Sequence, residues 1–325
     1  MADTEMTYRR LGTSGLVVST VGLGCNNLGR AGSATAEPAA AAAVVHAALD
    51  AGITLFDTAD VYGAPCGRSE ELLGAALGAQ RGNVVIATKF GMDARGANGV
   101  DFGARGSRRY IRQAVEASLR RLNTDWIDLY QIHEPDPETP LEETLAALHD
   151  LVREGKVRYL GHSNFAGWQL ADAAWTAQSA TRTPFISAQN HYSLLNRDAE
   201  RELIPAAHAF GVGVLPYYPL ANGLLTGKYT RSEVPAGSRL ATFKPGLLDT
   251  APWDVLGKLQ SFADERDIAM VDVAIGWLLA RPQVTSVLAG ASRPEQVTSN
   301  AAAATAWEPT DDELLMLNDI APLTT

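Results

Sequence analysis

Eight short runs of apolar residues recur along the chain, each bounded by glycine, proline or polar turn residues. The runs are rich in branched and aromatic side chains, a pattern typical of buried strands. They lie at residues 21–24, 54–58, 84–90, 126–133, 158–164, 185–189, 212–217 and 286–290. Strands that are covered on both faces are typical of parallel sheets.

Amphipathic stretches with helical periodicity separate most of these runs. They lie at residues 39–50, 69–77, 108–122, 141–154, 167–180, 199–210 and 269–280. Eight strands that alternate with helices favour a closed (β/α)8 TIM barrel, an α/β fold, over an open sheet. The composition does not change along this alternation, so we expect a single domain over residues 1–325.

Segments outside the alternation predict further features. Residues 8–18 predict a β-hairpin that turns at Thr13-Ser14-Gly15 and plugs the amino-terminal mouth of the barrel. Two long rim loops are expected at residues 92–107 and 220–250. Loops of this length are usually functional or disordered, and we favour function because both follow strands at the predicted active rim. Thr310 and the acidic residues after it resemble a helix start.

Composition and charge exclude several classes of protein. The chain has 325 residues, of which 46% are hydrophobic and 20% charged, which is an ordinary globular composition. No apolar run approaches the roughly 18 residues of a membrane-spanning helix, and the first residues lack a secretion signal. The two cysteines, Cys25 and Cys66, are expected to be reduced thiols in a cytoplasmic protein. A net charge of −10 disfavours nucleic acid as a partner. No pattern predicts an oligomeric state.

Four residues of different chemistry follow the ends of the predicted strands. Asp57 ends one apolar run, with Tyr62 just beyond it, while Lys89 and His133 end two others. Parallel α/β folds place their chemistry at the carboxyl ends of the strands. We therefore expect a carboxylate, a phenol, an amine and an imidazole to meet at one rim.

These four groups together suit proton transfer to a carbonyl oxygen. A phenol with a pKa of about 10 is a poor acid at neutral pH, but a nearby ammonium lowers that pKa. Asp57 would fix the position and charge of Lys89 beside Tyr62, and His133 would donate a hydrogen bond to the same oxygen. A donor aimed at a developing oxyanion is what reduction of an aldehyde or ketone needs.

Each residue taken alone has a simpler explanation. Asp57 and Lys89 could form a buried structural ion pair, Tyr62 could be a core or rim aromatic, and His133 could be a hydrogen-bonded core histidine. Their joint occurrence at separate strand ends favours the proton-transfer site.

Several segments resemble the motifs of the aldo-keto reductase superfamily. They are residues 56–63 with 67–70, residues 126–133 and residues 155–165, and the resemblance extends over nearly the whole chain. It implies a (β/α)8 barrel that binds NADPH without a Rossmann domain. It also implies that Tyr62 is the general acid and base, that Lys89 and Asp57 tune it, and that His133 orients the substrate carbonyl. The expected activity is reduction of a small carbonyl substrate.

The resemblance further implies the nicotinamide contacts. Ser163, Asn164 and Gln189 would grip the carboxamide, which suits hydroxyl and amide side chains. Tyr217 would stack on the nicotinamide ring, although a core aromatic is the alternative. The end of the first strand, with Gly24, Cys25 and Asn26, would line the same side.

The phosphate and adenosine contacts are expected from later segments. Residues 220–229 resemble the loop that wraps the pyrophosphate, and cofactor contacts are expected from Pro219, Leu220, Gly223, Leu225, Gly227 and Lys228. Ser292 and Arg293 precede Pro294 at a helix start, and we expect them to bind the 2′-phosphate of NADPH, unless Arg293 is a solvated surface residue. Gln296 and Asn300 match positions near the adenine, and Arg239 is a weaker candidate for the same side. Gly290 and Gln296 stand where some family members have lysine and arginine.

Other functions stay open. A nucleotide-sensing binding subunit, similar to the potassium-channel β subunits of the superfamily, is the main alternative; the histidine at position 133 disfavours it. A metal-dependent hydrolase on the same barrel is a third possibility, but the sequence has no His-x-His at a strand end, so we expect no metal. His162 has no predicted role beyond packing. Arg95, Arg105 and Arg108 would favour an anionic substrate or be solvated, so the substrate itself is not predicted.

Overall fold

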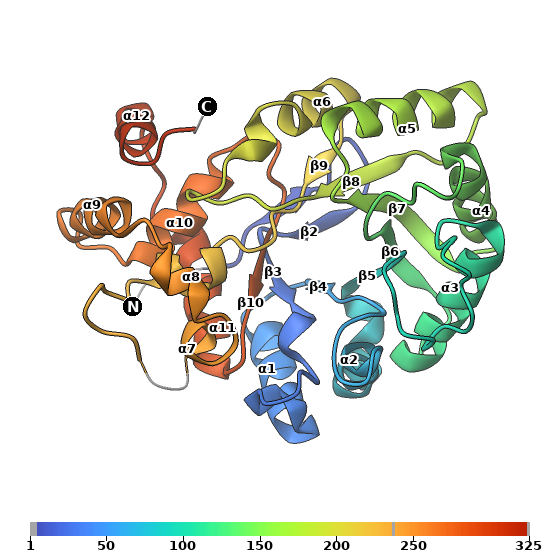
Figure 1. Ribbon diagram of the computed structural model, residues 1–325, viewed down its shortest axis with the longest axis horizontal. Helices are drawn as coiled ribbons and strands as arrows, with labels where there is room; N and C mark the ends of the chain where they lie inside the picture. The colour runs from blue at the N-terminus through green and yellow to red at the C-terminus, as the bar shows by residue number, and fades with distance from the viewer. Residues whose placement is uncertain (1–4, 236–237, 324–325) are drawn as a thin grey trace.

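A parallel sheet of eight strands forms the centre of the protein (Figure 1). The computed structural model describes residues 5–235 and 238–323. The strands follow one another round the sheet in the order β10-β3-β4-β5-β6-β7-β8-β9. Their bounds are β3 Val21–Gly24, β4 Leu55–Asp57, β5 Val85–Phe90, β6 Ile127–Ile132, β7 Val157–Ser163, β8 Phe185–Gln189, β9 Gly213–Val214 and β10 Val287–Gly290.

Backbone hydrogen bonds between the last strands close this sheet into a barrel. Val214 N–H donates to the Gln283 carbonyl (2.7 Å), and Leu288 N–H donates to the Pro216 carbonyl (3.1 Å). Tyr217 also forms a parallel bridge with Leu288. The predicted (β/α)8 barrel is therefore confirmed. The expected strand at 212–217 is regular only over Gly213–Val214, because Pro216 has no N–H to donate to the ladder.

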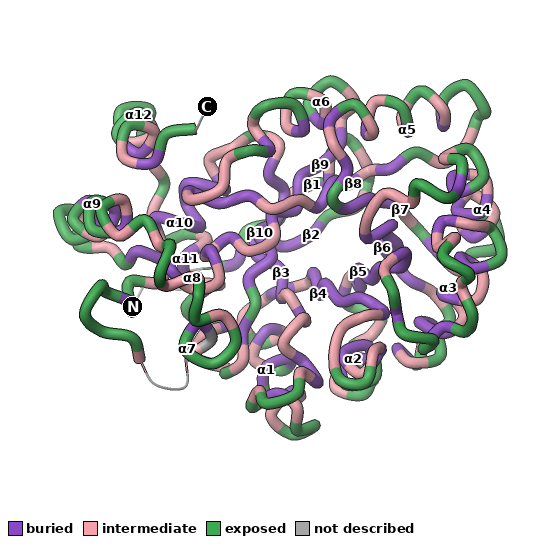
Figure 2. The backbone as a smooth tube through the Cα atoms, viewed as in Figure 1, coloured by how far each residue is buried: buried purple, intermediate pink, exposed green. Residues whose placement is uncertain are grey.

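Helices surround the barrel and cover it with their apolar faces. Figure 2 shows buried backbone along the strands and exposed backbone on the outer sides of the helices. The helices that follow strands are α1 Pro38–Asp50, α2 Arg68–Leu77, α3 Arg108–Leu122, α4 Leu141–Arg153, α5 Gly167–Ser179, α6 Leu203–Phe210, α10 Met270–Leu279 and α11 Pro294–Ala306. No helix among the described residues is long and apolar enough to cross a membrane.

The hairpin at the start of the chain covers the amino-terminal mouth of the barrel, as predicted. Strands β1 (Tyr8–Arg10) and β2 (Val17–Ser19) pair antiparallel. The hairpin buries Leu11 and Val18 in one cluster with residues from inside the barrel, namely Leu55, Ala87, Leu129, Leu215 and Leu288. Its apolar side chains therefore fill the bottom of the barrel.

Some predicted elements differ from the structure. The helix expected at 199–210 begins at Leu203, after a 3-10 turn at Asp198–Glu200, because Pro205 is tolerated only in the first turn of a helix. The expected loop 220–250 contains a 3-10 segment, η5 (Ala221–Thr226), and two short helices, α7 (Arg239–Phe243) and α8 (Gly246–Asp249).

Two helices near the carboxyl end lie outside the alternation. The prediction omitted α9 (Trp253–Asp264), although Leu256, Leu259 and Phe262 form its buried stripe; Gly257 in its middle weakens the helical pattern. The last helix, α12 (Asp311–Ile320), begins where the sequence predicted, with the Thr310 hydroxyl accepting from the Glu313 N–H.

Candidate active site

A buried ion pair joins the ends of β4 and β5. Lys89 Nζ donates to both carboxylate oxygens of Asp57 at 2.7 Å and to the Thr58 carbonyl at 2.8 Å. The Lys89 residue is 0% exposed and Asp57 4% exposed. Burial by itself would lower the pKa of Lys89, but the Asp57 carboxylate outweighs it and the pKa is raised. The amine is therefore held as an ammonium.

The turn after β4 brings Tyr62 against this ammonium. Asp60 N–H donates to the Lys89 carbonyl (3.1 Å), which ties the turn to β5. Lys89 Nζ lies 5.1 Å from the centre of the Tyr62 ring, and the Asn26 side chain lies beside the phenol. Burial raises the pKa of the Tyr62 phenol above its usual value, while Lys89 and the Asn26 amide oppose that rise. The hydroxyl is thus protonated near neutral pH and lies beside groups that stabilise its anion.

His133 lies at the end of β6 against the same phenol. The His133 and Tyr62 rings meet edge to face, with their centres 5.7 Å apart. Burial, and then the Lys89 charge, hold the pKa of His133 well below its usual value, so the imidazole is neutral. Its Nδ1 is buried and has no hydrogen-bond partner among the described residues. The structure therefore brings Asp57, Tyr62, Lys89 and His133 together at one rim.

Amide side chains surround the Asp57 carboxylate. Gln189 Nε2 donates to Asp57 Oδ1 at 2.8 Å, and Gln131 Nε2 lies 3.5 Å from the same oxygen. Ser187 donates in turn to Gln131 Oε1 at 3.4 Å. Gln189 thus uses its amide nitrogen to hold the ion pair, a role that the sequence analysis did not predict. Gln131 also was not predicted, since it lies within β6 and not at the end of the strand.

The ends of β7, β8 and β9 meet around Asn164. The Asn164 amide donates to the His133 carbonyl at 2.9 Å and accepts from the Tyr217 hydroxyl at 2.9 Å. Ser163 donates to the Gln189 carbonyl at 2.8 Å. One face of the Tyr217 ring stacks on His191, with the ring centres 5.5 Å apart. The residues predicted to hold a nicotinamide therefore form one connected group beside His133.

The barrel opening beside β3 and β10 carries small and polar residues. Gly24 and Gly290 are register partners at the carboxyl ends of these strands. Asn26 Oδ1 is buried without a partner among the described residues, so it is an unused acceptor next to Tyr62. Asn27 donates to the Ala291 carbonyl (3.2 Å) and links the two strand ends.

The predicted pyrophosphate loop follows directly after Tyr217. Gly223 and Gly227 have positive φ angles (105° and 75°), which favour glycine. Pro219 and Leu225 are buried, Leu220 is half-buried, and Lys228 is exposed with its Nζ 5.1 Å from the Tyr229 ring centre. Lys244, which the sequence analysis missed, donates to Asn222 Oδ1 (3.1 Å) from the end of α7. No sequence motif marked Lys244, because it lies in an expected loop.

The predicted adenosine contacts lie at the start of α11. Pro294 occupies its first turn and Arg293, which is exposed, precedes it, as expected. Gln296 Oε1 accepts from the Ser292 N–H (2.8 Å) and from the Ser292 hydroxyl (3.1 Å). Asn300 is buried on the same helix. Arg239 begins α7, but its side chain lies outside the described residues.

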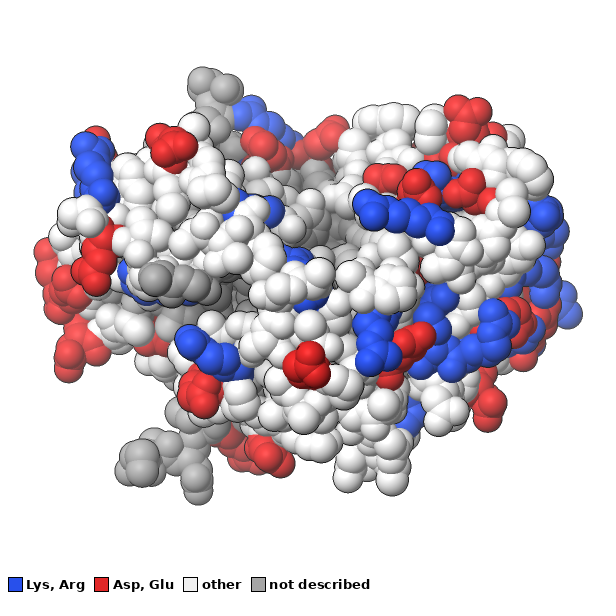
Figure 3. All heavy atoms as spheres, turned by 60° about the horizontal axis from the view of Figure 1, so that its bottom comes forward, with Lys and Arg blue, Asp and Glu red and all other residues white. Residues whose placement is uncertain are grey.

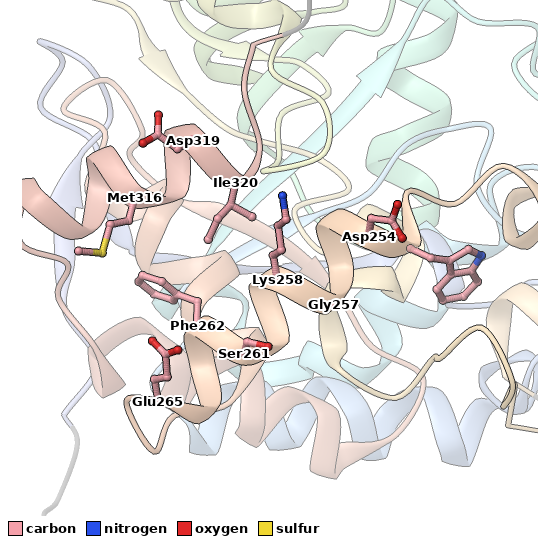
Figure 4. Close-up of a pocket in the computed structure, with 10 residues that line it drawn as sticks. Asp254, Gly257, Lys258, Ser261, Phe262, Glu265, Met316, Asp319 and Ile320 are labelled. Atoms are coloured by element: carbon pink, nitrogen blue, oxygen red, sulfur yellow. The ribbon is translucent and has the colours of Figure 1, made fainter.

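One hollow of the surface lies beside this site, and another lies away from it. A cavity of about 690 Å³ lies beside His133 and is lined by residues that include Ile132, Glu134, Asn164 and Trp168. A groove of about 790 Å³ lies between α9 and α12, away from the strand ends, and Figure 4 shows its residues on those two helices.

On the face shown in Figure 3, basic side chains are interspersed with acidic ones. Among the described residues, no three His, Cys, Asp or Glu side chains form a group that could hold a metal ion.

The fold and the site define an α/β barrel with a buried group of ionisable side chains at the carboxyl ends of its strands. The chain matches the Aldo/keto reductase family over residues 20–321, and it belongs to that family. It is 39% identical over 324 residues to an uncharacterized oxidoreductase, YrpG, of Bacillus subtilis (strain 168), covering 98% of this chain and 96% of the relative.

Other relatives carry different descriptions. L-glyceraldehyde 3-phosphate reductase of Escherichia coli (strain K12) is 35% identical over 309 residues, covering 91% of this chain and 87% of the relative. A probable voltage-gated potassium channel subunit beta of Oryza sativa subsp. japonica is 35% identical over 310 residues, covering 91% and 90%. Family membership and the named reductases support an oxidoreductase that acts on small carbonyl compounds.

Proposed function

We propose that this protein reduces an aldehyde or ketone to an alcohol with NADPH and that Tyr62 is the general acid. The observation that carries the proposal is the position of the Lys89 ammonium, which hydrogen-bonds Asp57 and lies 5.1 Å from the centre of the Tyr62 ring. An ammonium beside a phenol stabilises the phenolate that remains after proton donation. Asp57 keeps Lys89 charged and in place through two hydrogen bonds.

His133 would align the substrate in this mechanism. A neutral imidazole donates one hydrogen bond and adds no charge to the site. A carbonyl oxygen placed between His133 and Tyr62 would accept a hydrogen bond from each. Tyr62 would then protonate that oxygen as negative charge develops on it.

The residues at the rim fit a nicotinamide dinucleotide. The buried, unused Asn26 Oδ1 suits the N–H groups of a carboxamide, and the polar side chains of Asn164, Gln189 and Ser163 form a connected group at the same rim. Ser292 and Arg293 at the start of α11 suit a phosphate, which supports NADPH over NADH. When bound, NADPH supplies the hydride for the carbonyl carbon.

Both cysteines are free thiols, which supports a cytoplasmic location.

A binding subunit is the second candidate function. The potassium-channel-subunit relatives favour it, because they match nearly the same span of the chain at 35% identity. Mixing NADPH-loaded protein with a reactive aldehyde in a single-turnover experiment separates the two functions. Rapid NADPH oxidation is expected for the reductase, and its absence with every reactive aldehyde would favour the binding subunit.

Replacing Tyr62 tests the proposed acid. Tyr62→Phe keeps the ring but removes the proton, so kcat for carbonyl reduction should fall by about 10²–10⁴-fold while NADPH binding persists. Turnover is measured by NADPH absorbance, and binding by quenching of tryptophan fluorescence. The matched control is Tyr8→Phe, at an exposed tyrosine of the hairpin, which should keep wild-type kcat. Wild-type turnover in Tyr62→Phe would contradict the proposal.

A further inference from the structure

Glu70 is a buried carboxylate that the proposed mechanism does not use. It lies in the first turn of α2 and is 0% exposed. Its Oε1 accepts from the Thr88 hydroxyl at 2.6 Å, and its Oε2 accepts from Arg121 Nε at 2.6 Å. The two carboxylate oxygens therefore bind groups from two different elements, β5 and α3.

Thr88 connects this carboxylate to the strand that carries Lys89. Thr88 precedes Lys89 in β5 and is 0% exposed. Successive side chains of a strand point to opposite faces, so Thr88 faces α2 while Lys89 faces the barrel interior, where it binds Asp57. The contact with Glu70 thus fixes the end of β5 from outside the barrel.

Ser69 connects the same helix start to the turn that carries Tyr62. The Ser69 N–H donates to the Tyr62 carbonyl at 3.1 Å. The Ser69 hydroxyl donates to the Cys25 carbonyl at 2.9 Å and lies 2.9 Å from the Thr58 hydroxyl. Ser69 and Glu70 therefore join the backbone of Tyr62 to β5 through the first turn of α2.

Arg121 on α3 holds Glu70 in place. The ion pair is buried, with the Arg121 and Glu70 side chains 12% and 0% exposed. The Arg121 side chain passes directly over Gly67, where an added Cβ would lie 2.5 Å from Arg121 Cδ. Arg121 Nη2 also donates to Asn98 Oδ1 at 2.9 Å, which fixes the guanidinium plane. Burial and the neighbouring Glu70 raise the pKa of Asp60 to about 8, so near neutral pH Glu70 is the carboxylate that balances the Arg121 charge.

We propose that Glu70 is a positioning residue: its carboxylate, held by Arg121, joins the strand of Lys89 to the helix start that holds Tyr62. The relative position of the phenol and the ammonium then depends on a contact outside the barrel, which touches neither substrate nor cofactor. The link between the two segments stands independently of the reaction, whereas its effect on turnover rests on the proposed carbonyl reduction.

Thr88→Val tests the link with little change of shape. It replaces the hydroxyl by a methyl group and leaves the ion pair between Glu70 and Arg121 intact. Misplacing the phenol against the ammonium slows the chemical step, so kcat for nitrobenzaldehyde should fall by about 10- to 100-fold, while KM and the Kd for NADPH change by less than about twofold. Thr88→Ser keeps the hydroxyl and should retain the wild-type kcat.

Thr20→Val is the matched control. Thr20 is also buried and its hydroxyl lies 2.8 Å from that of Thr7, but it precedes β3 at the opposite, amino-terminal end of the barrel. Both valine variants lose a buried hydrogen bond, and calorimetry measures the resulting fall in Tm. Only Thr88→Val should lose kcat. A wild-type kcat in Thr88→Val, or an equal fall in Thr20→Val, would overturn the role of Glu70 in turnover.

A double variant separates positioning from the burial of an unpaired charge. Glu70→Met/Arg121→Met removes the link together with both charges, so no buried ion is left without a partner. Its kcat should fall at least as far as that of Thr88→Val, with the Kd for NADPH unchanged. A double variant that folds and keeps the wild-type kcat would contradict the proposal.

Hydrogen exchange measures the link without turnover. Protection of the Ser69 amide, corrected for intrinsic exchange and measured by NMR, should fall by about tenfold in Thr88→Val and stay at the wild-type level in Thr20→Val. If the wild type reduces no aldehyde at all, the proposed function fails, and this measurement still decides the link. Unchanged protection of Ser69 in Thr88→Val would then overturn it.

Discussion

Two buried histidines show how much the surroundings of a single residue determine its role. His133 lies at a strand end beside Lys89 and Tyr62, whereas His162 lies within β7 and packs against Phe165 and Phe185. Neither ring nitrogen of His162 has a hydrogen-bond partner among the described residues. His162 is therefore a packed core residue, as the sequence analysis expected, and it makes the fold sensitive to acid.

Replacing His162 should weaken the dependence of stability on pH. Burial lowers the pKa of His162 to about 3, whereas an unfolded histidine has a pKa of about 6.5. The unfolded state thus binds a proton first, and the stability present above pH 6.5 is lost as the pH falls. The loss from this group amounts to about 2 kcal/mol at pH 5. Denaturant unfolding at pH 8 and pH 5 should show a smaller difference for His162→Leu than for the wild type.

A second histidine variant controls for the overall charge of the protein. His46 is exposed on α1, so His46→Gln should retain the wild-type difference between the two pH values. An equal acid sensitivity in His162→Leu and the wild type would show that other groups cause it.

Among the secondary elements, the amino-terminal hairpin depends on the backbone conformation of a single residue, Gly12. Gly12 has a φ of +58°, and a Cβ at this position would lie 2.3 Å from the Gly211 carbonyl oxygen and 2.7 Å from the Gly213 nitrogen. Backbone atoms of β9 and its approach cannot give way as a flexible side chain could. The close packing of the hairpin against the barrel therefore requires glycine at position 12.

Gly12→Ala should displace the hairpin and destabilise the protein. A strained backbone conformation costs about 1–3 kcal/mol, which for this chain length lowers Tm by about 2–4 °C. Differential scanning calorimetry measures the change. Gly257→Ala is the matched control, because a Cβ there meets nothing within 4 Å in the middle of α9 and should raise Tm slightly. A Tm for Gly12→Ala equal to that of the wild type would contradict the packing argument.

For the whole molecule, the closed barrel brings residues from most of its strands to one rim. Gly24 ends β3 and Asn26 follows it, Tyr217 follows β9, and Ser292 follows β10, so a bound dinucleotide would touch segments from both ends of the chain. A ligand that binds only the folded state stabilises all of these segments together.

NADPH should therefore raise the melting temperature of the whole protein. At about 100 times Kd the stabilisation is about 2.7 kcal/mol, which corresponds to about 4 °C for a chain of this size. Arg293→Ala should reduce the shift with NADPH and leave the shift with NADH unchanged, since only NADPH carries the 2′-phosphate. Thermal melts with each nucleotide measure both shifts. Equal shifts with the two nucleotides in the wild type would contradict the proposed preference.

The sequence by itself determined the alternation of strands and helices, the plug and the four residues of the candidate site. Buried strands are short and apolar, and their ends are marked by polar residues, so a local pattern suffices to place Asp57, Lys89 and His133. The same local pattern failed at α9 and at residues 220–250, where glycine or proline interrupts the helical periodicity.

The tertiary structure decided which of these residues contact one another. Gln189 donates a hydrogen bond to Asp57, which lies 132 positions away in the sequence, and Asn98 donates one to Asp60, 38 positions away. No local sequence pattern encodes either pairing. Such contacts arise only when the strands close into a barrel and exclude water. Burial and neighbouring charge then set whether Tyr62, His133 and Asp60 hold their protons.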